Sequence, residues 1–282
     1  MVNESPDVRP RRRLRPTRRG RLVLIIGALL VVAAAVAVPL LISGTAGKKE
    51  QVRSLLVPEG MRASQVYAAA DRSLGVAAGT TERAVPSADL ALPVEARGNP
   101  EGYLFPATYP LASATTPKSL LRYMVDTALQ RFGADRITAG AQRNSVSVYQ
   151  SVTIASVVQA EADTASDMGK VARVVYNRLA RDMPLQMDST LNYALKRSTL
   201  DTTTGDTRID SPYNSYERKG LPPTPIGNPG EQAMRAAISP TPGPWLYFVT
   251  VAPGDTRFTD NYAEQLKNVE EFNRNRRAAT AG

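Results

Sequence analysis

The chain has 282 residues, 43% of them hydrophobic, which suffices for one sizeable folded domain with additions or for two smaller domains. Its net charge of +9 is concentrated at one end, because residues 1–21 hold eight arginines against Glu4 and Asp7 and so carry +6. The other residues carry +3, from 27 Lys and Arg against 24 Asp and Glu. The composition therefore gives little support to nucleic-acid binding by a folded domain.

The sequence contains neither cysteine nor histidine. Disulfides, thiolate nucleophiles and thiolate-held zinc are excluded, and so are Ser-His-Asp catalysis and histidine-ligated metals. Any catalysis must use carboxylates, hydroxyls, amides, Lys, Arg or Tyr, and we expect neither a cofactor nor a metal site.

Residues 22–42 form an uninterrupted uncharged run, LVLIIGALLVVAAAVAVPLLI. As a helix this run would extend for roughly 32 Å, enough to cross the hydrocarbon core of a bilayer. A cleaved signal peptide is the alternative, but the run is longer than a usual signal-peptide apolar region, and residues 43–47 match a cleavage site poorly. We therefore predict a retained single-pass anchor in the lipid bilayer of the cytoplasmic membrane. The basic tail 1–21 would lie in the cytoplasm and the chain from residue 44 outside it.

Residues 43–98 are expected to form a small subdomain followed by a linker. A short strand at 55–57 and a turn at 58–60 precede a helix that Ser64 could cap. Residues 78–98 show no periodic pattern and are predicted to be a long loop.

Residues 99–275 have the composition of a compact domain of the α+β class. Aromatic residues and prolines at 102–111 predict a strand at an edge or turn, and 244–249 predicts a second strand. Residues 201–230 are rich in Thr, Pro, Gly and Tyr and predict an ordered loop, with Asn228 as the N-cap of the helix that follows. Helical periodicity predicts helices at 117–132, 147–162, 168–181, 190–195, 230–238 and 261–275. Residues 276–282 are predicted to be a frayed tail.

Glu161 stands on the apolar stripe of the helix predicted at 147–162. An ionised carboxylate is unfavourable there unless it has a partner or a use. One interpretation is a general acid that its apolar surroundings keep protonated. The other is a structural glutamate paired with Arg173, Arg178 or a backbone amide, and the pattern alone favours this second interpretation.

Polar and aromatic residues gather in two stretches downstream. Residues 183–190 alternate like a short strand, after which Asp188 or Ser189 could begin the next helix. Residues 213–216 and 220–226 combine aromatic rings, an amide and a rigid proline loop. Such a surface suits a carbohydrate groove, where rings stack on sugars and amides bond hydroxyls, and it suits a plain rigid loop equally well.

Several motifs follow one another in a characteristic order: LLVPEGMRASQV (55–66), EGYLFPATY (101–109), TIASVVQAEA (153–162), VARVVYNRL (171–179), MPLQMDSTLNYAL (183–195), SPYNSY (211–216), GLPPTPIGNPG (220–230) and LYFV (246–249). The chain resembles the MltG/YceG-like endolytic murein transglycosylases, bacterial enzymes that cut the glycan strands of peptidoglycan. The first motif resembles the end of that family's small LysM-like region. The resemblance covers roughly residues 52–272.

The resemblance implies a small LysM-like unit packed near a lysozyme-like catalytic domain. It also implies that Glu161 is the catalytic acid and that Gln159, at the first acidic position of the family's pattern, is not. Substrate contacts are implied for a group of residues in the later motifs: Gln186, Asp188, Tyr213, Asn214, Tyr216, Leu221 and Pro222. Thr256 and Gln265 depart from the family, since many relatives carry histidines at these places.

The implied reaction needs one carboxylate. Glu161 would protonate the glycosidic oxygen between N-acetylmuramic acid and N-acetylglucosamine, then remove the proton of the sugar's own C6 hydroxyl, leaving a 1,6-anhydromuramoyl end. A muramidase-type hydrolase would need a second carboxylate, for which Asp188 is the candidate. A catalytically silent peptidoglycan-binding scaffold is a third hypothesis, suggested by Gln159. The family also implies peptidoglycan synthases as partners and the termination of nascent strands as a role.

Overall fold

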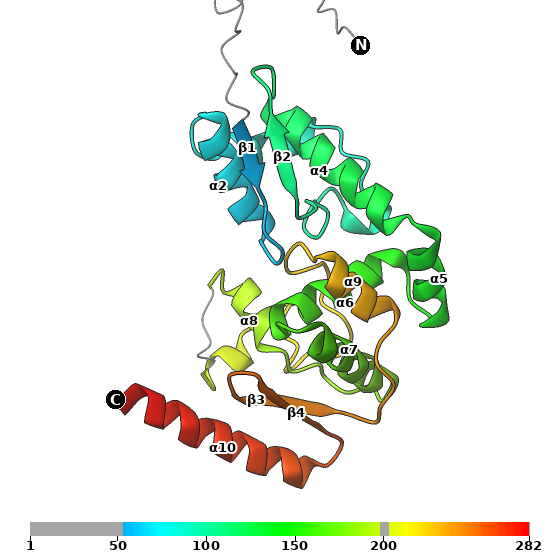
Figure 1. Cartoon of the computed structure of the whole chain (residues 1–282), viewed down its shortest axis with the longest axis vertical. Helices are drawn as coiled ribbons and strands as arrows, with labels where there is room; N and C mark the ends of the chain where they lie inside the picture. Colours follow the sequence, from blue (N-terminus) through cyan, green and yellow to red (C-terminus); the bar gives the residue numbers. More distant parts are fainter. Residues whose placement is uncertain (1–52, 198–202, 282) are drawn as a thin grey trace, which may run out of the picture. The chain divides into compact units, whose positions relative to one another are not determined.

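The computed structural model describes residues 53–197 and 203–281 (Figure 1). The predicted tail 1–21 and the predicted membrane span 22–42 lie outside these ranges. Within them, none of the helices combines the length and the apolar character needed to cross a membrane. The described residues have a mixed helix and sheet architecture, with two separate two-stranded antiparallel sheets.

The first sheet joins segments on either side of the boundary predicted at residue 98. Strand β1 (Arg53–Leu56) pairs antiparallel with β2 (Thr108–Leu111), with Leu55 opposite Tyr109. Helix α2 (Ala63–Leu74) packs on β1, and helices α3 (Thr80–Ala84) and α4 (Pro117–Phe132) pack against α2 and against each other. The small N-terminal unit is therefore completed by residues that follow the predicted linker.

Two details of this unit differ from the sequence prediction. The N-cap of α2 is Arg62, whose N–H is accepted by the Gln65 side chain, so Ser64 lies inside the helix and does not cap it. Residues 78–98 are not one long loop, because they contain α3 and two short 3-10 helices, η1 (Val85–Ser87) and η2 (Val94–Ala96). The buried Asp71 carboxylate holds the start of α3, since it accepts the N–H and the hydroxyl of Thr81 at 2.8 and 2.6 Å.

The second part of the chain is built around α6 (Val148–Glu161), whose residues 151–158 are all buried. Helices α5 (Asp135–Arg143), α7 (Ala165–Ala180), α8 (Asp188–Ala194) and α9 (Glu231–Ile238) all contact it (Figure 1). The apolar pattern did not predict α5. Helix α7 begins three residues earlier than predicted because Thr164 caps it, accepting the Asp167 N–H at 3.1 Å.

The segment predicted to be a strand at 183–187 forms a single isolated bridge, between Pro184 and Lys219. The ordered loop that follows α8 has one short 3-10 helix, η3 (Asp206–Arg208), among its described residues.

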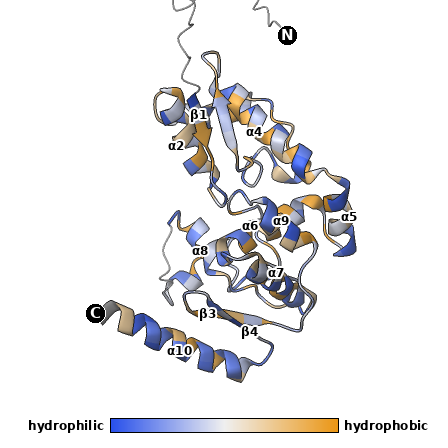
Figure 2. Ribbon diagram, in the orientation of Figure 1, coloured by the Kyte–Doolittle hydropathy of each residue, from blue (hydrophilic) through white to orange (hydrophobic). Residues whose placement is uncertain are grey.

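The C-terminal part is a hairpin covered by a long helix. Strands β3 (Tyr247–Ala252) and β4 (Asp255–Thr259) pair, and α10 (Tyr262–Ala281) packs on β3. Helix α10 is largely hydrophilic (Figure 2) and continues past residue 275 to Ala281, where the sequence predicts a frayed tail.

Asn228 joins the two parts and does not cap α9, whose N-cap is Gly230. The Asn228 side chain accepts the Leu104 N–H at 2.8 Å and donates to the Met61 carbonyl oxygen at 2.7 Å. Backbone bonds between Gly60 and Asn228 and between Asn228 and Met61 complete the link. The turn before α2 is thereby held against the start of α9.

Candidate active site

Glu161 is the last residue of α6, and its side chain is half-buried. Its Oε1 accepts the backbone N–H of Ser189, near the start of α8, at 3.2 Å. The Ser189 hydroxyl lies nearby, buried and without a hydrogen-bond partner among the described residues. Helices α6 and α8 therefore bring together two stretches that are 28 residues apart in the chain.

Burial raises the pKa of the Glu161 carboxyl. Ser189 lowers the pKa of Glu161, which opposes the effect of burial. Its N–H donates to the carboxylate, and its hydroxyl lies close enough to contribute although it forms no hydrogen bond. The negative charge on Asp188 raises the pKa further. A carboxyl in these surroundings keeps its proton to a higher pH than a free glutamate and can act as a general acid.

Neither arginine that the sequence offers as a partner pairs with Glu161. Arg173 donates to the carbonyl oxygens of Thr241 and Pro240 at 3.1 and 3.3 Å. Arg178 donates to other carbonyls, and Glu161 forms no salt bridge within the part of the chain that the structure describes. A structural ion pair is therefore not the reason for a carboxylate at this position, although a backbone amide does contact it.

Asp188 and Tyr216 form the second polar pair of the site. The Tyr216 hydroxyl donates to Asp188 Oδ1 at 2.5 Å. Burial raises the pKa of Tyr216, as do the charges of Asp188 and Glu161, so the phenol lies close to both carboxylates. Of the residues predicted to act on substrate, the structure gathers Glu161, Asp188 and Tyr216.

Gln186 lies beside this group in a strained backbone conformation, with φ of 52°. Its N–H donates to the Ser215 carbonyl oxygen at 2.9 Å, and its side-chain oxygen accepts from Arg178 Nη1 at 2.9 Å. Because Gln186 is exposed, its side-chain amide nitrogen stays available to a ligand.

Arg178 is the cation that organises this corner of the site. It is 6% exposed and also donates to the carbonyl oxygens of Leu246, Pro184 and Leu185 at 2.7, 2.9 and 3.0 Å. The sequence indicated Arg178 only as a partner of Glu161. Neither this bonding nor the Ser189 contact follows from spacing, because each joins segments that meet only in the folded chain.

Asn214 builds the loop and does not face a ligand. It is 1% exposed, its amide donates to the carbonyl oxygens of Thr207 and Ile209, and its oxygen accepts the Tyr216 N–H. For this residue, the interpretation as part of a rigid loop fits better than that of a sugar contact.

The remaining predicted contacts form a neighbouring aromatic group. Tyr213 is half-buried, and its ring centroid lies 4.9 Å from that of Tyr193, while its hydroxyl is 2.9 Å from that of Thr224. Leu221 is half-buried and Pro222 is buried. Tyr213 and Leu221 pack against the hydrophobic core, and the hydrogen bond of Tyr213 to Thr224 does not reach Glu161.

The three departures from the family all make structural contacts. Gln159 Oε1 accepts the Gly230 N–H at 3.0 Å and so holds the start of α9. The Glu59 carboxyl lies against the same glycine, so the neutral Gln159 avoids a second negative charge there. Thr256 bonds to Thr250 across the hairpin, and the Gln265 amide donates to the Phe248 carbonyl oxygen.

A buried glutamate, Glu101, lies between the two parts of the chain. It is 4% exposed, and it accepts the Ala63 N–H at 2.9 Å and the Tyr193 hydroxyl at 3.1 Å. Burial raises its pKa to about 7, against the opposing effects of these hydrogen bonds and of the Arg62 charge. Over residues 53–197 and 203–281, no group of three or more acidic side chains is arranged to hold a metal ion.

Comparison with known proteins identifies relatives of the chain. The sequence model of the YceG-like family matches residues 32–271. The 2.6 Å crystal structure of a yceG-like protein from Listeria monocytogenes superposes with a TM-score of 0.69, at 28% identity, over 78% of this chain and 77% of that one.

Two curated relatives bear the name endolytic murein transglycosylase. The protein of Bacillus subtilis (strain 168) is 37% identical over 174 residues, which are 61% of this chain and 48% of the relative. That of Streptococcus pneumoniae serotype 2 is 37% identical over 190 residues, which are 64% of this chain and 34% of the relative. The matched segment thus spans about half of the first relative and about a third of the second.

Proposed function

The chain belongs to the YceG-like family, and from this premise we propose that it is an endolytic lytic transglycosylase of peptidoglycan. It would cleave glycan strands between N-acetylmuramic acid and N-acetylglucosamine. The observation that carries the proposal is Glu161, a half-buried carboxyl with a raised pKa at the end of α6. The names of the curated relatives support the substrate and the endolytic mode.

Glu161 would serve both steps of the reaction. In the first, its proton passes to the glycosidic oxygen while the bond from that oxygen to C1 of the muramic acid breaks. In the second, the resulting carboxylate takes the proton of the C6 hydroxyl, whose oxygen bonds to C1 and closes the 1,6-anhydro ring. The carboxyl is then protonated again, so one group suffices and no water is consumed.

The residues around Glu161 support this cycle. The Ser189 N–H stabilises the carboxylate formed in the first step, and the charge of Asp188 favours return of the proton in the second. A water-consuming hydrolase is the second candidate, because Asp188 lies near Glu161 and could activate water. Its hydrogen bond from Tyr216 holds it in place for either role.

The predicted environment of the enzyme remains part of the proposal. Residues 22–42 would anchor the chain in the cytoplasmic membrane as a single pass, with the folded part outside. The unit of β1, β2 and α2 would correspond to the LysM-like region. Peptidoglycan synthases would be partners in terminating new strands. Extraction of cell membranes with alkaline carbonate tests the anchor, because an anchored chain stays in the pellet.

Mass spectrometry of digested strands tests the reaction. Purified glycan strands treated with the full chain should yield fragments from internal cleavage that end in 1,6-anhydromuramic acid. Reducing muramic acid ends, heavier by one water, would instead identify a hydrolase. If the wild type is active and Glu161→Gln is not, Glu161 is the catalytic acid. No product from either protein favours the silent scaffold, and equal product from both excludes Glu161 as the acid.

A further inference from the structure

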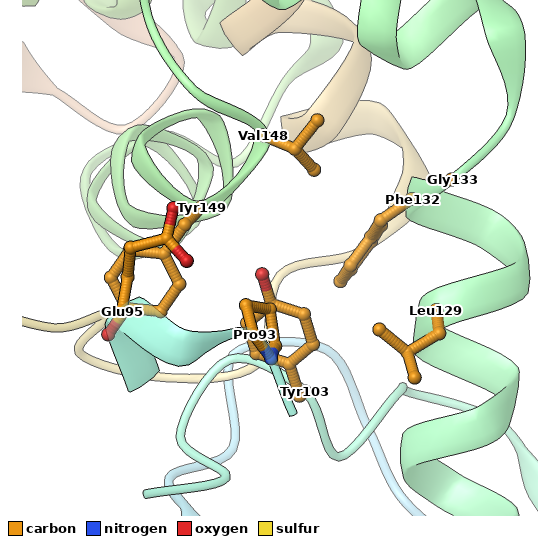
Figure 3. A pocket seen from close by; sticks show the side chains of 8 residues that line it. All are labelled: Pro93, Glu95, Tyr103, Leu129, Phe132, Gly133, Val148 and Tyr149. Atoms are coloured by element: carbon orange, nitrogen blue, oxygen red, sulfur yellow. The ribbon is translucent and has the colours of Figure 1, made fainter. Parts of the chain in front are cut away.

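A pocket lies near the opposite end of α6 from Glu161. It has a volume of about 160 Å³ and opens between η2, α4 and the start of α6 (Figure 3). Its wall is mostly aromatic and apolar, formed by the following residues: Pro93, Tyr103, Leu129, Phe132, Val148 and Tyr149. Tyr149 and Glu161 are twelve residues apart on one helix, about 18 Å along its axis. The pocket is therefore separate from the site around Glu161.

Two tyrosine hydroxyls in this wall lack partners. Tyr103 is 1% exposed and Tyr149 is 7% exposed, and neither hydroxyl has a hydrogen-bond partner among the described residues. The two rings stack with centroids 6.1 Å apart. Figure 3 shows the Tyr103 hydroxyl pointing into the space between Val148 and Phe132. A buried hydroxyl without a partner is unfavourable, so both groups are poised to donate to an acceptor.

The third polar group of the pocket is the exposed Glu95. Its charge raises the pKa of both Tyr103 and Tyr149, although burial contributes more to each, so the carboxylate lies close to the two phenols. A negative charge at this place disfavours an anionic ligand. It favours one that offers an N–H beside its acceptor oxygen.

We propose that this pocket binds an acetamido group. The amide oxygen would accept from Tyr103 or Tyr149, the amide N–H would donate to Glu95, and the methyl group would pack against Phe132, Leu129 and Val148. The volume is adequate, since a cavity of about 150 Å³ holds a benzene molecule.

The source of the acetamido group follows from the proposed function, on which this part of the inference rests. Both sugars of a peptidoglycan strand carry an acetamido group. Burial raises the pKa of Tyr149, and its interaction with the Tyr213 phenol raises it further. The pocket would bind a sugar remote from the cleaved bond and thereby help to set where a long strand is cut.

A titration of the full chain carrying Glu161→Gln, which keeps the ligand intact, tests the proposal. Three ligands are compared by calorimetry: the β-1,4 tetramer of N-acetylglucosamine, its fully deacetylated form, and N-acetylalanine methylamide as a peptide source of the same amide. Methyl NMR signals of Leu129 and Val148 report whether the pocket is occupied. We expect the acetylated tetramer to bind and to shift these signals, and the deacetylated tetramer not to do so.

Tyr103→Phe and Tyr149→Phe, each added to this chain, remove one hydroxyl and little else. The variant that removes the hydroxyl donating to the amide oxygen should weaken binding of the acetylated tetramer about threefold to tenfold, as expected for one hydrogen bond. Neither should lower the melting temperature, because the lost hydroxyl had no protein partner. Tyr176→Phe is the matched control, since its hydroxyl donates to the Ala237 carbonyl oxygen outside the pocket, and it should leave binding unchanged.

Equal binding of acetylated and deacetylated tetramers, or no loss of affinity in the two phenylalanine variants, would overturn the proposal. Binding of the alanine amide but not of the tetramer would keep the amide site and overturn its assignment to a sugar. These outcomes do not depend on cleavage. A chain that binds as expected but gives no anhydro product therefore contradicts the proposed function alone.

Discussion

Glu161 and Glu101 have the same chemistry and a pKa raised by the same cause, but they lie in different surroundings. Glu101 is enclosed, and its two oxygens accept bonds from Ala63 and Tyr193. Glu161 is half-buried and accepts one bond, from the Ser189 N–H, among the residues that the structure describes. The comparison teaches that a raised pKa does not identify a catalytic acid. An acid must also have an oxygen that a substrate can reach.

The largest effect expected is the loss of activity in Glu161→Gln. Because the amide cannot donate and then recover the proton, we expect the cleavage rate to fall by about 10²–10⁴-fold. The melting temperature should not fall, since a neutral amide suits a partly buried site at least as well as a carboxyl. The rate is measured by chromatography of released anhydro fragments, and a variant that unfolds would contradict the assignment of Glu161 to catalysis alone.

Glu101→Ala should show the opposite pattern, a loss of stability. The substitution leaves the Ala63 N–H and the Tyr193 hydroxyl unpaired and creates a cavity. We expect it to lower the unfolding free energy by about 2–4 kcal/mol at pH 5. Urea unfolding measures this loss. Activity per folded molecule should remain within a few-fold of the wild type, and a loss as large as that of Glu161→Gln would break the distinction between the two glutamates.

Glu101 should make a contribution to the stability of the wild type that is lost as pH rises. Its pKa is about 7 in the folded chain and 4.5 as the reference value, so between these values the unfolded chain loses its proton first. The contribution of Glu101 to the unfolding free energy should therefore be highest below pH 4.5, decrease through this window by up to about 3 kcal/mol, and level off above pH 7. Glu101→Gln should remove this part of the slope, as compared by urea unfolding at pH 5 and pH 8. An unchanged slope would show that Glu101 ionises normally.

Asp188→Asn should have the smallest effect and concerns only the region of Glu161. Asparagine can still accept from Tyr216 but carries no charge, so the pKa of Glu161 should decrease. The alkaline limb of the pH–rate profile, where Glu161 loses its proton, should move to lower pH, with a much smaller loss of rate than in Glu161→Gln. Loss of all activity at every pH would instead support a hydrolase in which Asp188 activates water.

Most of the helices could be predicted from periodicity and end signals, including the short α8 and α9, whereas α3 and α5 were missed. Helix α4 and the buried α6 follow their apolar patterns within a residue or two. Helix α3 was missed because the Asp71 carboxylate, eight or more residues away, holds it. Asn228 has the sequence signature of an N-cap, but its side chain forms tertiary hydrogen bonds with Leu104 and Met61 instead.

The residues alone exclude thiol and imidazole chemistry, and the order of their motifs indicates both the family and Glu161. The exclusion follows because residue types limit the available chemistry whatever the fold, whereas the role of Glu161 is what the resemblance to the family implies. Only the tertiary structure, which sets α8 beside the end of α6, brings Ser189 and Tyr216 close to the acid, since neither residue is local to Glu161 in the sequence. The stacking of the Tyr103 and Tyr149 rings likewise depends on packing between distant segments. Spacing along a chain predicts neighbours on one helix, whereas burial, a raised pKa and an unpartnered hydroxyl arise where helices meet.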